Sequence, residues 1–214
     1  MARVIGIMGE SGSGKTTSMR NLNPETTFYI DCDKKGLSWK GWKDKYISGQ
    51  NYWPTDNPTD VLSILKKINE VGKFKNVKTV VIDTINGVMV AEEMRNAKVQ
   101  GFGKWTDLAQ YVWSIFDYCL TMRENVTIII VAHSITDTDD AGLIFTHIRT
   151  NGRKLEKIVL ESKLNTVLLA ECKDGKYIFH TKADRSSVKT PLGAFEEDEI
   201  DNDIAKVIKA LEDY

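Results

Sequence analysis

The residues whose chemistry is easiest to recognise lie near the N-terminus, where residues 9–16 spell Gly-Glu-Ser-Gly-Ser-Gly-Lys-Thr. The pattern G-x-x-x-x-G-K-[ST] is typical of a phosphate-binding loop, whose lysine reaches the β- and γ-phosphates of a nucleotide. Glycines lack a Cβ atom, so the backbone can turn its N–H groups inward and form a nest for an anion. The threonine hydroxyl is a hard oxygen ligand of the kind that Mg²⁺ prefers. The sequence therefore predicts a nucleotide site made of Gly9, Glu10, Ser11, Gly12, Ser13, Gly14, Lys15, Thr16 and Thr17.

The surroundings of this loop are those that a phosphate-binding loop requires. Residues 3–8 are a short apolar run of the kind that forms a buried parallel strand. Residues 17–22 can continue as a helix, and a helix that begins near Lys15 would add the positive end of its dipole to the anion site. An ordinary turn rich in glycine and serine could match the pattern by accident, but the order of strand, loop and helix favours a phosphate site.

A second stretch that could do chemistry is residues 77–84, an apolar run that ends in Asp83 and Thr84. An apolar strand ending in aspartate is the Walker B pattern, whose carboxylate holds the Mg²⁺ shell opposite the hydroxyl of the loop. We therefore predict that Thr16 and Asp83 bind Mg²⁺. Many ring ATPases carry a water-activating glutamate where this chain has Thr84. The chain must supply its base from elsewhere, or hydrolyse ATP slowly.

Candidates for that base lie on neighbouring segments. Residues 26–33 form a predicted strand that ends in Asp31 and Asp33, and ligands in open α/β sheets sit at the carboxyl ends of strands. Successive side chains point to opposite faces of a strand, so only one of these two acids should face the ligand. Aspartate is also common in plain turns after a strand. The other candidates are Glu92 and Glu93, on the segment after the Walker B strand.

Residues 126–134 form another predicted buried strand, which ends in His133 and Ser134. In a sheet of this kind that end also points at the nucleotide, so His133 could sense the γ-phosphate by hydrogen bonding. The plainer alternative is a histidine whose hydrogen bonds are satisfied at the end of a strand.

Residues 84–105 combine basic and aromatic side chains, whereas residues 135–151 are polar and lead into a small basic cluster at Arg149, Arg153 and Lys154, which the resemblance described below adds to the DNA candidates. On flexible loops such residues can follow a phosphate backbone and stack on bases. Composition alone slightly favours surface loops of ordinary type. The candidates for DNA binding are Arg95, Lys98, Phe102, Lys104, Trp105, Arg149 and Arg153. A third segment, residues 34–56, carries tryptophans and tyrosines that either stack on a base or pack an irregular stretch.

The remaining patterns predict helices and one hairpin. Apolar residues at helical spacing predict helices over residues 58–72, 105–123, 155–162 and 199–214. Two β-prone runs flank Asp174-Gly175, which is a strong signal for a β-hairpin. The acids at the start of the last helix would complement its dipole.

Composition narrows the class of protein. The chain has 214 residues, of which 42% are hydrophobic, as expected of a packed α/β domain. No apolar stretch approaches the ~20 residues of a membrane span, and the first strand begins at once, so we expect no signal peptide and no membrane partner. The net charge of −1 includes an acidic run at residues 196–203. The rest of the chain is mildly basic, which permits DNA binding.

The ordered set of strand ends, with the loop, Asp33, Asp83 and His133 followed by a hairpin, resembles the RecA-like core of ATPases. Over nearly the whole chain the sequence looks most like the small phage-encoded, core-only RecA-type proteins linked to single-strand annealing recombination. Residues 189–195 of the C-terminal tail are also similar to theirs.

The resemblance implies an organisation for the whole chain. We expect a single RecA-like P-loop NTPase domain over residues 1–214, of the α/β class, with a mostly parallel central sheet flanked by helices. An antiparallel hairpin and tail should occupy about residues 164–195, and a last helix about residues 199–213.

The resemblance also implies roles for individual residues. RecA-like proteins place a catalytic carboxylate, often glutamate, where this sequence has the shorter Asp33, and often a glutamine sensor where it has His133. Their two mobile DNA loops follow the third and fourth strands. The implied catalytic residues are therefore Lys15, Asp33, Asp83 and His133. Such ATPases complete the site with basic residues of a neighbouring subunit, for which the candidates are Lys182, Arg185 and Lys189.

The function implied is an ATPase that uses ATP and Mg²⁺, hydrolyses slowly and is stimulated by single-stranded DNA, which it binds and anneals in phage recombination. Its partners would be single-stranded DNA, further copies of the chain in a ring or filament, and a single-strand DNA-binding protein in the host cytoplasm. Two alternatives stay open. One is a P-loop small-molecule kinase, with Gly152-Arg153-Lys154 as a thin candidate for its arginine lid. The other is a nucleotide-dependent DNA-binding or assembly protein that does not hydrolyse ATP.

Overall fold

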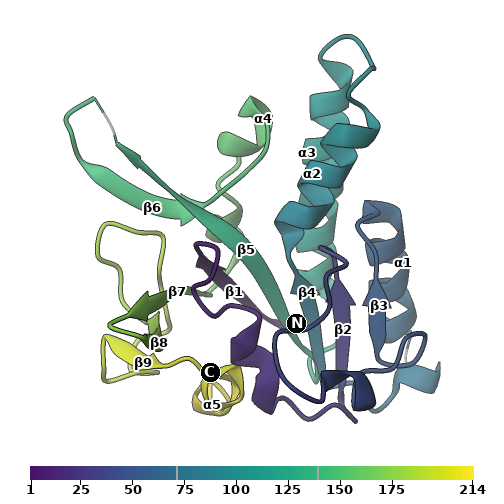
Figure 1. Cartoon of the computed structure of the whole chain (residues 1–214), viewed down its shortest axis with the longest axis vertical. Coiled ribbons are helices and arrows are strands. Elements are labelled where there is room, and N and C mark those ends of the chain that lie inside the picture. The colour runs from purple at the N-terminus through teal and green to yellow at the C-terminus, as the bar shows by residue number, and fades with distance from the viewer. Residues whose placement is uncertain (71, 139) are drawn as a thin grey trace.

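A computed structural model describes residues 1–70, 72–138 and 140–214. Its strands form a central sheet in the order β3-β2-β4-β5-β1-β7-β8-β9, with β6 paired to the outer part of β5 (Figure 1). The strands are β1 (Arg3–Gly9), β2 (Thr27–Asp31), β3 (Tyr52–Pro54), β4 (Thr79–Asp83), β5 (Thr127–Thr138), β6 (Ile144–Ile148), β7 (Thr166–Lys173), β8 (Lys176–His180) and β9 (Glu199–Asp201). Strands β1 to β5 and β7 pair in parallel, whereas β6, β8 and β9 are antiparallel to their neighbours. The predicted fold class, a mostly parallel α/β sheet with a C-terminal antiparallel hairpin, is confirmed.

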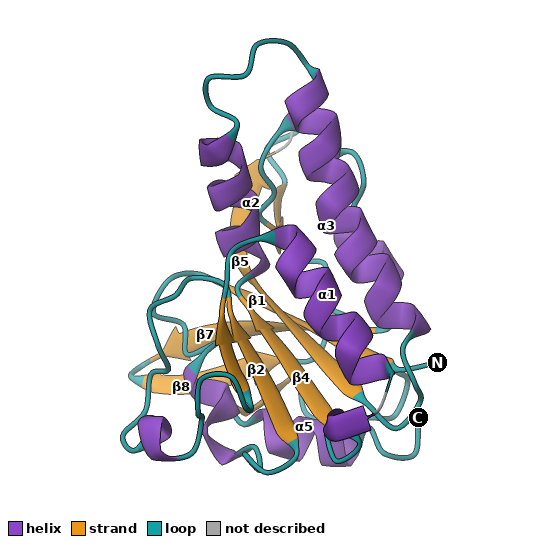
Figure 2. Ribbon diagram, turned by 90° about the vertical axis from the view of Figure 1, so that its right-hand side faces the viewer, coloured by secondary structure: helices purple, strands orange, loops and turns teal. Residues whose placement is uncertain are grey.

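Helices cover both faces of this sheet. They are α1 (Pro58–Asn69), α2 (Ile85–Arg95), α3 (Gly103–Thr121), α4 (Arg153–Glu156) and α5 (Ile204–Ala210). Helices α1, α2 and α3 pack on one face (Figure 2), because their apolar stripes meet alternate side chains of the apolar strands. The other face packs against α5 and the aromatic segment after β2. In the part of the chain that the structure describes, no helix is long and apolar enough to cross a membrane.

The register of the parallel strands brings the predicted site residues to one edge. Strand β5 lies between β1 and β4, so that Gly9 pairs with His133, and Asp83 pairs with Val131 on one side and Asp31 on the other. The carboxyl ends of these strands therefore meet around the phosphate-binding loop.

The segments that were predicted as DNA loops are more ordered than expected. Residues 84–105 contain α2, whose N-cap Thr84 accepts a hydrogen bond from the backbone N–H of Gly87. The buried residues of α2 lie in its first turns, so the sequence shows no sustained apolar stripe. Within residues 135–153, β5 continues and pairs with β6 to form a hairpin. Both faces of that hairpin are largely exposed, so the buried and exposed alternation of a strand is absent.

Other elements correct the sequence predictions at their ends. The segment after the loop is a short 3-10 helix at Thr17–Asn21 rather than an α-helix. The predicted helix over residues 155–162 is replaced by α4 and a 3-10 turn at Leu160–Lys163. The predicted last helix is wrong over Glu199–Asp201, which forms β9 against β8, and α5 starts only after Asp203, whose carboxylate caps it.

Four predictions of local structure are confirmed. Helix α1 begins at Pro58 behind the cap of Asn57, and α3 follows the predicted apolar stripe. The hairpin of β7 and β8 turns at Asp174 and Gly175, whose φ angles of 51° and 78° suit a two-residue turn of this chemistry. The aromatic rings after β2 pack edge-on against one another, Trp39 on Tyr46 and both on Tyr29, so the packing interpretation of that segment is correct.

Candidate nucleotide-binding site

The loop after β1 has the geometry of an anion nest. Gly12 and Gly14 have φ angles of 81° and 87°, which side chains other than glycine seldom adopt. A Cβ atom at Gly9 would lie 2.5 Å from the Ser13 hydroxyl and 2.6 Å from the carbonyl oxygen of Ala170. Strand β7 therefore presses directly on the loop, and only glycine fits at its start.

Lys15 is held inside this loop by its own backbone. The ammonium group donates hydrogen bonds to the carbonyl oxygens of Gly9 at 2.8 Å and Glu10 at 2.6 Å, and the residue is only 6% exposed. Burial lowers the pKa of Lys15 to about 8, against the raising effect of the nearby Asp83 carboxylate. The ammonium therefore lies in the position from which it can exchange carbonyl oxygens for phosphate oxygens.

The predicted Mg²⁺ ligands are in contact. The Thr16 hydroxyl donates to Asp83 Oδ2 at 2.7 Å, and the buried Tyr29 hydroxyl makes a short hydrogen bond to the same oxygen. The second oxygen of Asp83 is buried and has no hydrogen-bond partner among the described residues. Burial raises the pKa of Asp83, while the hydrogen bonds from Tyr29 and Thr16 lower it.

A hard cation fits this donor set. A hydroxyl and a carboxylate with an unpartnered oxygen are the ligands expected at a Mg²⁺ site that shares its shell with phosphate and water. No group of three or more histidine, cysteine or acidic side chains that could hold a metal occurs among the described residues. Tyr29 was missed in the sequence, although a tyrosine inside a buried strand signals that its hydroxyl has a partner.

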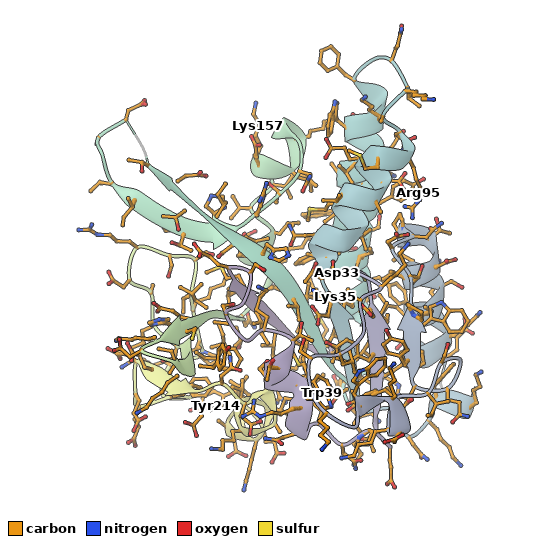
Figure 3. All side chains as sticks on the ribbon, in the orientation of Figure 1. Asp33, Lys35, Trp39, Arg95, Lys157 and Tyr214 are labelled. Carbon is orange, nitrogen blue, oxygen red and sulfur yellow. The ribbon has the colours of Figure 1, made fainter. Side chains whose placement is uncertain are left out.

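Asp33, rather than Asp31, turns toward the loop. Asp33 accepts hydrogen bonds from Lys35 Nζ at 2.6 Å and from the Thr84 hydroxyl at 3.1 Å. Figure 3 labels Asp33 and Lys35 beside each other, where the sheet meets α2. Asp31 instead accepts from the backbone N–H of Gly36 at 2.8 Å and thereby holds the loop that carries Lys35.

The alternative bases are engaged elsewhere. Glu92 bonds to Arg95 and Asn96 at the far end of α2, and Glu93 accepts from the side-chain amide of Asn151. Neither glutamate lines the cavity beside the loop. Asp33 does not line this cavity either, but it accepts hydrogen bonds from two residues that do, Lys35 and Thr84, and is therefore the best placed of the three acids.

His133 lies at the same edge of the sheet. Its backbone N–H donates to the side-chain oxygen of Asn86 at 2.7 Å, and the Asn86 amide donates to the Arg149 carbonyl oxygen at 2.8 Å. Burial, followed by the positive charge of Lys15, lowers the pKa of His133. A neutral imidazole therefore faces the site at neutral pH. No local pattern marks Asn86, because its role depends on contacts of α2 with β5 and with the segment after β6, which arise only in the fold.

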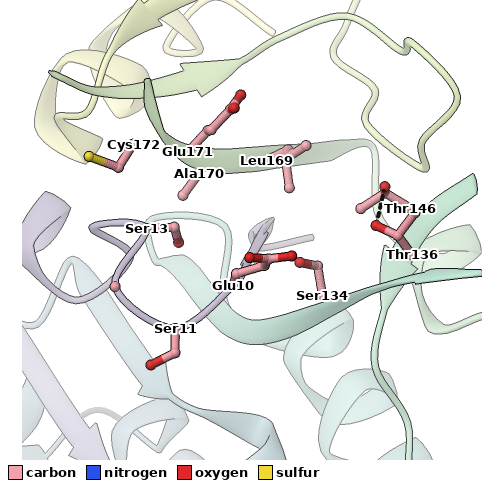
Figure 4. Close-up of a pocket in the computed structure, with 11 residues that line it drawn as sticks. Glu10, Ser11, Ser13, Ser134, Thr136, Thr146, Leu169, Ala170, Glu171 and Cys172 are labelled. Carbon is pink, nitrogen blue, oxygen red and sulfur yellow. Dashed lines mark hydrogen bonds between the residues drawn. The ribbon is translucent and has the colours of Figure 1, made fainter. Parts of the chain in front are cut away.

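A cavity of about 280 Å³ joins these groups. It is lined by Ser11, Gly12, Gly14, Lys15, Thr16, Thr17, Lys35, Ser38, Thr84, His133 and Tyr177. A second cavity of about 400 Å³ adjoins the loop and is lined by Glu10, Ser11 and Ser13 on one side and by Leu169 and Glu171 of β7 on the other (Figure 4). The Ser13 hydroxyl is buried and has no partner among the described residues.

The structure does not bring the predicted DNA-binding residues to the phosphate cavity. Arg95 ends α2 and pairs with Asp56 and Glu92 rather than extending from a loop. Lys98 and Phe102 lie in the turn between α2 and α3, Phe102 with 89% of its surface exposed. Lys104 and Trp105 lie at the start of α3, where Lys104 Nζ is 5.5 Å from the centre of the Trp105 ring. Arg149 is exposed and follows β6. Arg153 is at the start of α4, and its side chain is outside the described part.

The basic residues predicted to act on a neighbouring subunit follow β8. Lys182 pairs with Asp198 at 2.5 Å, and the carbonyl oxygen of Arg185 accepts from the backbone of Thr146 in β6. Lys189 exchanges backbone hydrogen bonds with Val167. None of these three side chains lines the phosphate cavity of its own chain.

A parallel sheet with a glycine loop at the carboxyl end of β1, a lysine inside the loop and a hydroxyl–carboxylate pair beside it defines a P-loop nucleotide-binding protein. The comparison with protein families gives the same class and is more specific. A family model described as an AAA domain matches residues 1–189, and the chain belongs to this family of P-loop ATPases. Membership implies binding of ATP, usually with Mg²⁺. The family description names neither DNA nor recombination, and a search of the curated proteins finds no match.

Proposed function

We propose that the protein binds ATP with Mg²⁺, hydrolyses it slowly, and couples this cycle to the binding of single-stranded DNA. The observation that carries the proposal is the meeting of Lys15, the Thr16–Asp83 pair and Asp33 at one edge of the sheet. Each is a group that phosphoryl transfer to water requires: a cation for phosphate, ligands for Mg²⁺, and an acceptor for the proton of water.

Each residue of the site has a separate role in this reaction. Lys15 and the N–H groups of residues 9–16 bind the phosphates. Thr16 and Asp83 would hold Mg²⁺, which would supply positive charge against that of the phosphates. Asp33 orients a water molecule and accepts its proton while the water oxygen bonds to the γ-phosphorus and ADP leaves. His133, which is neutral at neutral pH, senses the γ-phosphate by forming a hydrogen bond to it. The position after Asp83 holds Thr84, so slow turnover is the expected result.

Binding of DNA is supported by where the two projecting hairpins begin. Helix α2 starts next to Asp83, and β5 runs on past His133. The α2–α3 hairpin and the β5–β6 hairpin therefore both leave the sheet at the edge that carries the phosphate-binding loop (Figure 1). A ligand that moved either hairpin would therefore act on the site. Phe102 and Lys98 lie in the same turn between α2 and α3, and an exposed ring and an ammonium group there suit stacking on bases and contact with phosphates.

The experiment that tests this function is ATP turnover with and without single-stranded DNA, at two salt concentrations. We expect stimulation by DNA that fades as salt rises, because each phosphate contact releases counterions. Turnover that ignores DNA would remove both hairpins from the site and point to another partner. Transfer of labelled phosphate to a small molecule would instead identify a kinase.

Tight ATP binding without turnover is the second candidate, and one observation favours it. Both oxygens of Asp33 already have partners, Lys35 and Thr84, so in this state the carboxylate is not free to accept a proton. If no phosphate is released even with DNA, the protein uses ATP binding alone for DNA binding or assembly.

A further inference from the structure

The segment after β2 places two adjacent lysines in different surroundings. Lys34 has a φ angle of 54°, and its ammonium pairs with Asp56, away from the cavity. Lys35 turns the other way, donates to Asp33 Oδ2 at 2.6 Å and lines the phosphate cavity. The two side chains are exposed to the same extent, 52% and 51%, so the difference between them is one of direction.

The loop that carries Lys35 is held from both sides. Asp31 accepts from the backbone of Gly36 and from the Tyr52 hydroxyl at 2.6 Å, which ties the loop to β2 and β3. On the other side, Asp56 pairs with both Lys34 and Arg95. The ammonium of Lys35 is therefore presented to the cavity by a fixed backbone, while its long side chain keeps the freedom to change partners.

Lys35 faces Lys15 across the same cavity. Besides burial, the positive charge of Lys35 helps to lower the pKa of Lys15, so the two ammonium groups repel each other in the free protein. An anion between them would relieve that repulsion. Lys15 takes the phosphates that lie inside the loop, and a second cation next to Asp33 suits the terminal phosphate.

We propose that Lys35 is a catalytic residue that binds the γ-phosphate of ATP bound to the same chain. To do so, its ammonium group leaves Asp33. This inference rests on the proposed function. The Lys35 side chain is half-exposed, at 51%, and ion pairs with an exposed lysine are weak, so a terminal phosphate with its larger charge competes successfully with Asp33. When the lysine leaves, Asp33 Oδ2 is free to accept a proton from water.

The exchange links the presence of ATP to the activity of the base. In the free protein Lys35 occupies the oxygen of Asp33 that a water molecule needs. With ATP bound, Lys35 lies on the γ-phosphate, the water gives its proton to Asp33, its oxygen bonds to the γ-phosphorus, and the bond from that phosphorus to ADP breaks. Lys35 keeps its protons throughout and stabilises the charge on the transferred group.

The test compares the affinities of ADP and of a non-hydrolysable imido analogue of ATP, measured by calorimetry with Mg²⁺. Lys35→Ala should weaken binding of the analogue by about 10- to 100-fold, since a hydrogen bond between charged groups contributes ~1.5–3 kcal/mol. Binding of ADP, which has no γ-phosphate, should change much less. Lys34→Ala is the matched control, because it removes the same charge at the same exposure. The Asp31 contacts with Gly36 and Tyr52 do not involve Lys34 and still hold the loop, so both affinities should stay as in the wild type.

A second background separates binding of the phosphate from masking of Asp33. If Lys35 only masks the negative charge of Asp33, Lys35→Ala will have no effect on analogue affinity once Asp33→Asn has removed that charge. If Lys35 binds the γ-phosphate, the loss persists in the double variant. Asp33→Asn alone should then tighten binding of the analogue, because the lysine no longer has a competing partner.

The outcomes are distinct. The exchange is supported if Lys35→Ala selectively lowers affinity for the analogue and the loss persists in the Asp33→Asn background. Lys35→Arg should restore part of the preference for the analogue over ADP. Equal loss of both nucleotides, loss in the Lys34 control, or no loss in the double variant would overturn it. If the wild-type protein binds both the analogue and ADP, and the Lys35 variants bind them with the same affinities, this inference alone is overturned. A wild-type protein that binds neither nucleotide overturns the proposed function as well.

Discussion

The sheet edge around the phosphate-binding loop and the two projecting hairpins, α2–α3 and β5–β6, differ in how firmly their side chains are held. At the edge, Lys15 donates to two carbonyl groups of its own loop, and Asp83 and Asp33 each accept hydrogen bonds from two side chains that belong to different segments of the chain. On the hairpins, by contrast, large apolar side chains such as Phe102 and Phe145 stand in solvent. The groups whose distances matter for the chemistry lie where the sheet fixes them, whereas the contact with DNA that we propose falls to the projecting elements.

The strongest test of this comparison removes the lysine of the loop. Lys15→Ala should reduce ATP turnover by roughly 10²–10³-fold, the usual loss when one preorganised donor to the transition state is removed. The protein should stay folded, because Lys15 bonds only to carbonyl groups of its own loop. Steady-state phosphate release and far-ultraviolet circular dichroism measure the two effects. A folded variant with full turnover would show that the loop does not bind the reacting phosphates.

The rigidity of the edge can be broken at a glycine. A Cβ atom at Gly87 in the first turn of α2 would lie 2.6 Å from Asp33 Oδ1 and 2.6 Å from the Cys32 carbonyl oxygen. Gly87→Ala should therefore displace Asp33 and cost ~1–3 kcal/mol of stability through overpacking. A shift of about 1 Å at a reacting group can lower turnover by about 10²-fold.

A matched control lies at the start of the next helix. A Cβ atom at Gly103, the first residue of α3, meets nothing within 4 Å. Gly103→Ala should keep both the melting temperature and the turnover of the wild type. If Gly87→Ala also keeps full turnover despite lower stability, Asp33 is not the group that accepts the proton.

The pH dependence of binding sharpens the same comparison. The pKa of Lys15 is lowered to about 8 in the free protein, and a bound phosphate must raise it. Binding therefore takes up a proton above pH 8, and affinity falls as the pH rises, by up to about tenfold per pH unit. Calorimetry with the imido analogue between about pH 7.5 and about pH 9.5, where the phosphate itself is fully ionised, measures this effect.

Substitution at the same position supplies the control for this pH series. Lys15→Arg keeps the positive charge at every pH of the series, since arginine does not lose its proton in this range. Its affinity, whatever its absolute value, should be flat with pH. A wild-type affinity that stays constant up to the ordinary pKa of lysine would contradict the buried position of the ammonium group.

The sequence predicted the parts of the site that are local in the chain. The loop, Thr16 and Asp83 follow from motifs in which the residue type and the spacing together define the chemistry. The hairpin at Asp174 follows in the same way, because a two-residue turn needs particular φ angles. Parallel strands with continuous apolar runs made the sheet predictable as well.

The sequence failed where long-range packing decides the outcome. Tyr29 and Asn86 act through partners on other strands, and no local pattern marks those contacts. The residues before α5 were predicted as helix from their spacing, yet β8 offers them a strand edge and Asp203 caps the helix after them. The β5–β6 hairpin lacked a signal because its apolar residues are not buried on one face.

The smallest expected effect concerns the hairpins, where single contacts should count for less than at the edge. Phe102→Ala removes a ring that is 89% exposed and next in sequence to the first turn of α3. Stacking of a base on an aromatic ring contributes ~1–3 kcal/mol, and for a ring with so few contacts of its own we expect the low end, a loss of about fivefold in affinity for single-stranded DNA. Fluorescence anisotropy of a labelled oligonucleotide measures it. Leu192→Ala, at a position 99% exposed in the tail after β8, is the control for loss of an exposed apolar group. Equal affinities for the two variants would remove the α2–α3 hairpin from the DNA contact and leave the β5–β6 hairpin as the remaining candidate.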